Sequence, residues 1–91
     1  MAKVKIGKKE YELDTLSALD LKKMEAKKVE LKLTEYDYSY YIMLHAVKKY
    51  NPDVDMTLEE FQESFPLKGL KKKFAELGDV LGLDFKLGIG K

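Results

Sequence analysis

The chain contains no cysteine and no arginine among its 91 residues. The absence of cysteine excludes disulfide bonds, thiolate catalysis and cysteine-ligated metal sites, and it fits a reducing compartment. All 17 basic residues are lysine, and 16 acidic residues nearly balance them, which leaves a net charge of +1. A balance this close to neutral provides no general attraction to nucleic acid or to an anionic membrane. Nucleic-acid recognition is weakened further because bidentate contacts to phosphate and guanine are typical of arginine.

Long apolar runs are also missing. No stretch approaches the ~20 consecutive apolar residues that a membrane span requires, and the N-terminal lysines are not followed by the apolar segment of a signal peptide. We therefore expect a cytoplasmic protein without membrane association. A chain of 91 residues suffices for one small domain with a modest core. The fold class that we predict is α+β and mostly helical, with an N-terminal β-hairpin packed on a bundle of three to four helices.

Alternating residues near the N-terminus predict the hairpin over residues 2–13. Val4 and Ile6 alternate with lysines, and Tyr11 and Leu13 alternate with glutamates. A period of two turns one face of each strand towards a core and the other towards water. The segment Gly7-Lys8-Lys9 is a short glycine-containing turn between the two strands. Lysines on the first strand can then face glutamates on the second.

One helix is expected at the centre of the domain. Thr34 is a suitable N-cap, Asn51-Pro52 ends the helix, and the residues from Tyr40 to Val47 are apolar on nearly all sides, which is typical of a central helix. Other helices are expected before and after it. The predicted helices cover about residues 17–30, 35–50, 58–65 and 67–78, within a single compact domain of residues 1–82 that precedes a flexible tail of residues 83–91.

The first helix has two apolar sides. Ser17 and Asp20 resemble a capping box at its start. Leu21 and Met24 then fall on one side of the helix, whereas Leu19 and Ala26 fall on another, so we predict a surface helix that touches two neighbours. Residues 29–33 alternate between apolar and charged side chains, and this pattern fits either the end of the helix or a short extended connector.

The last helix carries a regular apolar stripe. Its members recur at intervals of three, four, three and four residues, which is the period of an amphipathic helix. They are Leu67, Leu70, Phe74, Leu77 and Leu81. Gly78 is expected to weaken or end the helix. The stripe either covers the core of the domain or presents a groove-binding face to another protein. Tyrosine is enriched at protein interfaces, so the candidate partner-binding residues are Leu67, Leu70, Phe74, Leu77, Leu81, Tyr36 and Tyr40.

No residue pattern indicates catalysis, a metal or a cofactor, and we expect a protein that is not an enzyme. His45 is the only histidine and is interpreted as a residue at the edge of the core, because it has no motif partners. A calcium loop is a poor match for the acidic cluster of Asp53, Asp55, Glu59 and Glu60, which is better explained by capping and solvation. The alternative function is a small nucleic-acid-binding regulator that uses the helix with Lys68 and Lys71–Lys73. The near-neutral charge argues against it.

Three segments carry a resemblance to a known family: the opening VKIGKKEYEL, the junction MTLEEFQESFP and the final helix LKGLKKKFAEL. With the tyrosine-rich helix between them, this layout resembles the tail assembly chaperones of long-tailed bacteriophages that infect Gram-positive hosts, over residues 2–82. The resemblance implies a non-enzymatic protein that coats the hydrophobic tape-measure protein and keeps it soluble while tube subunits polymerise around it.

The same resemblance implies that the protein is absent from the finished virion and that the tail tube protein is a second candidate partner. It also implies that a longer form can arise by ribosomal frameshifting, which the protein sequence does not show. The sequence leaves open whether the chain is a monomer or associates with itself.

Overall fold

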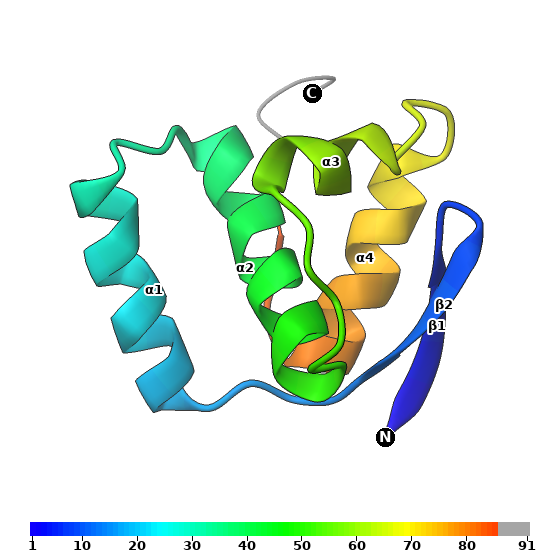
Figure 1. The fold of residues 1–91 in the computed structure, drawn as a ribbon, viewed down its shortest axis with the longest axis horizontal. Coiled ribbons are helices and arrows are strands. Elements are labelled where there is room, and N and C mark those ends of the chain that lie inside the picture. The colour runs from blue at the N-terminus through cyan, green and yellow to red at the C-terminus, as the bar shows by residue number, and fades with distance from the viewer. Residues whose placement is uncertain (86–91) are drawn as a thin grey trace.

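The computed structural model describes residues 1–85. Figure 1 shows helix α2 in the middle, with α1 on one side of it and α3, α4 and the hairpin on the other. Within the described residues, a two-stranded antiparallel sheet precedes four helices, and this confirms the predicted α+β, mostly helical fold. The elements in chain order are β1 (Ala2–Ile6), β2 (Lys9–Leu13), α1 (Ala18–Glu30), α2 (Glu35–Tyr50), α3 (Leu58–Glu63) and α4 (Leu70–Leu81).

The hairpin has the predicted alternation. Lys3 pairs with Glu12 and Lys5 pairs with Glu10 across the two strands, while the other face of the sheet is buried. The turn is shorter than expected, since it holds only Gly7 and Lys8. Gly7 has a φ of +65°, which suits the first central position of a two-residue hairpin turn.

Asn51, the residue that ends α2, covers the free edge of β2. The Glu12 N–H donates to Asn51 Oδ1 over 3.1 Å, and Asn51 Nδ2 donates to the Glu12 carbonyl over 2.8 Å. The side-chain amide therefore forms hydrogen bonds with the Glu12 N–H and carbonyl, as the backbone of a neighbouring strand would. Such a contact protects a sheet edge from unwanted pairing and fixes the hairpin against the central helix.

Helix α2 is the centre of the core, as predicted. Thr34 caps it by accepting from the Asp37 N–H. The Tyr40 ring lies edge-to-face with the rings of Tyr36, Phe65 and Phe74, at centroid distances of 4.9, 5.2 and 5.2 Å. Each such pair contributes about 0.5–1.5 kcal/mol beyond the area that it buries. Burial also raises the pKa of Tyr40 above its ordinary value.

The alternating residues 29–33 contain the end of α1 and a turn. Lys32 has a left-handed φ of +54°. The Leu33 N–H donates to the Lys28 carbonyl over 3.0 Å, and the Lys32 N–H donates to the Val29 carbonyl over 3.2 Å. This is the Schellman pattern of a helix end. A lysine takes the position that usually holds glycine, at a cost of roughly 1 kcal/mol.

Two predicted helix boundaries are corrected by the structure. Helix α3 ends at Glu63 rather than at Phe65, although Phe65 still packs in the core. Helix α4 begins at Leu70 rather than at Leu67, because Gly69 has a left-handed φ of +77° and lies outside the helix.

Helix α4 also runs past Gly78 to Leu81, and the chain after it is packed. The Leu83 N–H donates to the Gly78 carbonyl over 2.9 Å. The Phe85 ring lies 6.0 Å from that of Phe74, and Leu83 also packs on the core. A flexible tail that begins at residue 83 is therefore wrong for residues 83–85, while residues 86–91 lie outside the described part of the chain.

Candidate partner-binding site

The apolar stripe of the last helix lies in the domain's own core. Its four helical members are at most 5% exposed and pack together with residues of α2, α3 and the hairpin. The interpretation that the stripe covers the core is therefore correct. The prediction that these residues contact a partner is corrected, because a buried side chain offers no surface in the folded domain. The residues concerned are Leu70, Phe74, Leu77 and Leu81.

The remaining three predicted residues fall in three different environments. Tyr40 is also buried, at 2% exposure, so its assignment to a partner surface is corrected in the same way. Tyr36 is half-buried, and its hydroxyl lies 2.7 Å from that of Tyr40. Leu67 is 75% exposed and lies in the loop before α4. The structure therefore does not bring the predicted contact residues together on one accessible face.

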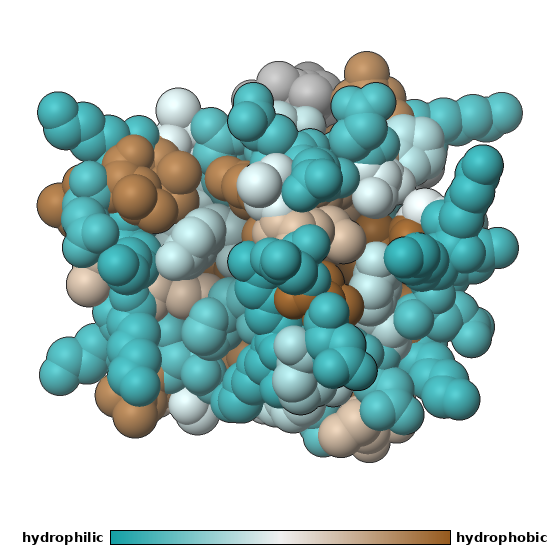
Figure 2. Space-filling view, viewed as in Figure 1, coloured by the Kyte–Doolittle hydropathy of each residue, from teal (hydrophilic) through white to brown (hydrophobic). Residues whose placement is uncertain are grey.

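The apolar surface that the domain does leave open is on α1. Only Met24 of this helix is buried, where it faces α2. On the opposite side, Leu19 is 58% exposed and Val29 is 79% exposed. Leu31, just beyond the helix, is 51% exposed but follows Val29 by two residues and does not share its side. Figure 2 shows an apolar patch over the C-terminal end of α1, next to the turn that leads to α2. We call Leu19, Ala26 and Val29 the α1 face.

The signal for the α1 face was present in the sequence. The sequence places Leu19 and Ala26 on a second side of the first helix and predicts a second neighbour there. Val29 follows Ala26 by three residues and so falls on the same side. Among residues 1–85, no other element covers that side, and Ala26 and Val29 are both exposed. The sequence pattern thus located the face but not the absence of an internal partner.

The inner side of α1 is attached to α2 by polar contacts around Asp20. Asp20 Oδ2 lies 2.6 Å from Lys49 Nζ, and Asp20 Oδ1 lies 3.2 Å from His45 Nε2. The Ser17 N–H also donates to Asp20 over 2.9 Å, which completes the predicted capping box. Lys49, Ser17 and His45 together hold the pKa of Asp20 well below its usual range.

His45 accordingly has a structural position at the boundary between α1 and α2. It lies beside an open groove of about 360 Å³ between the two helices, which Met24, Ala26 and Tyr41 also line. At the other end of α1, Lys28 contacts Glu35 and lies 4.9 Å from the centroid of the Tyr38 ring. These contacts keep the inner side of α1 on α2 and leave Leu19 and Val29 directed outwards, with Ala26 at the edge of the groove.

Replacing Asp20 with asparagine is expected to lower the free energy of unfolding by about 1–3 kcal/mol near pH 7, since a hydrogen-bonded charge is lost. A carboxyl whose pKa is lowered on folding stabilises the protein above its unfolded pKa of about 3.9, and that contribution disappears as the pH falls towards the folded value. Urea unfolding of both proteins over this pH range is the measurement. Asp53→Asn, at an exposed position, is the control, and a difference independent of pH would contradict the assignment.

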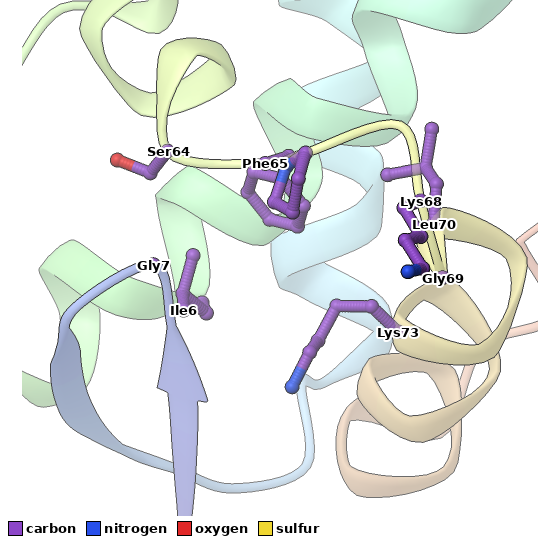
Figure 3. Close-up of a pocket in the computed structure, with 9 residues that line it drawn as sticks. Ile6, Gly7, Ser64, Phe65, Lys68, Gly69, Leu70 and Lys73 are labelled. Atoms are coloured by element: carbon purple, nitrogen blue, oxygen red, sulfur yellow. The ribbon is translucent and has the colours of Figure 1, made fainter.

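The lysines proposed as a nucleic-acid contact do not form one free cluster. Lys73 Nζ donates to the Lys5 carbonyl over 2.8 Å and to Glu76 over 2.9 Å. Figure 3 shows Lys73 reaching from α4 towards the hairpin, while Lys68 lies on the loop before that helix. The pocket between them has a volume of only about 60 Å³. Lys68, Lys71 and Lys72 are exposed.

The acidic cluster after α2 contains a second capping box. The Thr57 N–H donates to Glu60 over 2.8 Å, and the Glu60 N–H donates to the Thr57 hydroxyl over 3.2 Å. Across residues 1–85, no group of three histidine, aspartate or glutamate side chains is placed to hold a metal ion. No helix in this part of the chain combines the length and apolar character that crossing a membrane would require.

No protein-family model, curated protein sequence or solved structure matches the chain.

Proposed function

We propose that this protein is a non-enzymatic phage tail assembly chaperone that binds helices of the tape-measure protein and keeps them soluble during tail assembly. The observation that carries the proposal is the α1 face, a set of exposed apolar side chains on the outside of a domain whose core is already filled. The resemblance of the sequence to tail assembly chaperones supplies the identity of the partner. The α1 face supplies the means of binding it.

The chemistry of the α1 face suits an amphipathic helix. An apolar side chain that stays in water in the free protein gains roughly 25 cal/mol for each Å² that a partner covers. One short helix provides only a weak contact, but a tape-measure protein is long and repetitive in its helical pattern. Many weak contacts along one partner give high total occupancy through avidity.

The chaperone would act in the cytoplasm of the infected bacterium and leave before the virion is complete. The tail tube protein is a second expected partner, because tube subunits must take the place of the chaperone on the tape-measure protein. Binding rather than catalysis accounts for both contacts.

Co-expression with the tape-measure protein of the same phage tests this function. We expect the wild type to raise the soluble fraction of that protein several-fold, and the variant Leu19→Lys/Val29→Lys to lose most of this effect. Both positions are exposed, so the variant should keep the wild-type unfolding curve. The control Lys71→Glu/Lys72→Glu alters exposed residues of α4 and should retain activity. A wild type that leaves the solubility unchanged would overturn the proposal.

A further inference from the structure

We propose that two copies of this protein pair through their α1 helices, which lie antiparallel with the two α1 faces in contact. The inference goes beyond the proposed function, since it requires no other protein. The second copy occupies the α1 face until another helix replaces it. The pairing rests on the spacing and the charges of one side of α1.

Four exposed residues of α1 have the spacing of a helix-pairing seam. Leu19, Lys22, Ala26 and Val29 follow one another at intervals of three, four and three residues, which is the a/d pattern of two packed helices. Met24, on the opposite side, contacts α2. Leu19, Lys22 and Val29 lie away from Met24, while Ala26 lies at the edge of the groove between α1 and α2. Pairing therefore leaves the contact of Met24 with α2 in place.

The lysine within the seam selects the direction of pairing. In a parallel pair, Lys22 would face Lys22 of the second copy inside an apolar contact, and like charges there are repelled. In an antiparallel pair, Lys22 faces Ala26 of the second copy, whose small side chain leaves room for the lysine stem. The same register places Leu19 opposite Val29 of the second copy, so the two ends of the seam are apolar.

The charges beside the seam also match in this direction. Glu25 flanks the seam on the same side as Lys22, and the antiparallel register brings Lys22 level with Glu25 of the second copy. Two-fold symmetry forms this ion pair twice. Asp20, Lys27 and Lys28 are already engaged within the chain, whereas Lys22 and Glu25 form no ion pair within residues 1–85.

The pair is expected to be weak. It joins two helices of 13 residues each, which is a smaller contact than permanent dimers use, and Lys23 adds a like charge on the other edge of the seam. The expected dissociation constant is on the order of 10–100 μM. A weak pair suits a face that must later accept a different helix.

Sedimentation equilibrium of the full chain, up to about 1 mM, tests the pairing. We expect the wild type to form dimers, and Lys22→Glu or Glu25→Lys alone to weaken them by about tenfold or more, because each places like charges opposite one another. The double variant Lys22→Glu/Glu25→Lys restores opposite charges and should restore most of the dimer. Val29→Lys should abolish it.

A wild type that stays monomeric over the whole range would overturn the inference, and so would a double variant that pairs no better than the single variants. Either result, together with intact solubilisation of the tape-measure protein, would reject the pairing and leave the proposed function standing. Absence of solubilisation by a chain that still forms dimers would reject the proposed function and leave the pairing standing.

Discussion

Phe74→Ala is expected to lower the free energy of unfolding by about 3–5 kcal/mol, which is the usual cost of removing a large buried aromatic side chain. Phe74 is 1% exposed. Its ring contacts Tyr40, Phe65 and Phe85 at centroid distances of 5.2, 6.3 and 6.0 Å. Small domains are stable by only about 5–15 kcal/mol, so the variant should be close to unfolding at ambient temperature.

Leu67→Ala is the matched control for Phe74→Ala. The two residues belong to the same predicted stripe, but Leu67 is 75% exposed, and its truncation should change the stability by no more than about 0.5 kcal/mol. The free energies of unfolding of the two variants are compared from their urea unfolding curves, which should have equal slopes. Equal costs for Phe74→Ala and Leu67→Ala would show that α4 is not packed in the core as described.

Gly78→Ala is expected to destabilise the domain by about 1–3 kcal/mol through overpacking. Helix propensity alone predicts the reverse, since alanine is favoured over glycine inside a helix by about 1 kcal/mol. A Cβ atom at Gly78 would lie 2.5 Å from the Leu83 carbonyl oxygen. The chain after α4 would have to move, and the contact between Phe85 and Phe74 would be lost with it.

The cost of Gly78→Ala can be assigned to that one contact by shortening the chain. In a protein that ends at Gly82, the Leu83 carbonyl is absent, and the same substitution should be neutral or stabilising. The measurement is the thermal unfolding of four proteins, namely the full and the shortened chain, each with and without Gly78→Ala. It gives the effect of the substitution on stability in each chain length. A similar cost in both chain lengths would place the cause elsewhere in α4.

Local patterns in the sequence predicted most of the fold. Alternation predicted the buried face of the hairpin, and the side chains of Ser17 and Thr34 marked two helix starts that the structure confirms. These signals are local because a capping hydroxyl acts on an N–H only a few residues away. The predicted end of α4 at Gly78 is wrong because the helix continues to Leu81 and ends before Gly82, which has a left-handed φ of +82°. Gly78 is required by the approach of Leu83, which no helix period reveals.

The candidate site was harder to predict for a related reason. An apolar stripe such as Leu70, Phe74 and Leu77 has the same sequence pattern whether it covers a core or binds a partner. Only the packed structure shows that α4 covers the core, and that Leu19 and Val29 of α1 stay in water. The weaker pattern on α1 was the one that marked the open surface, because the other elements do not extend to that side.

The most direct test of the α1 face uses the absence of cysteine from the chain. Single cysteines placed by Val29→Cys and by Ala75→Cys, both at exposed positions, can be labelled with a thiol reagent at low micromolar protein, below the concentration at which copies pair. If the α1 face binds the tape-measure protein, adding a soluble segment of that protein slows labelling at position 29 at least several-fold and leaves position 75 unchanged. Equal rates at position 29 with and without the segment, or protection at position 75 instead, would contradict the account.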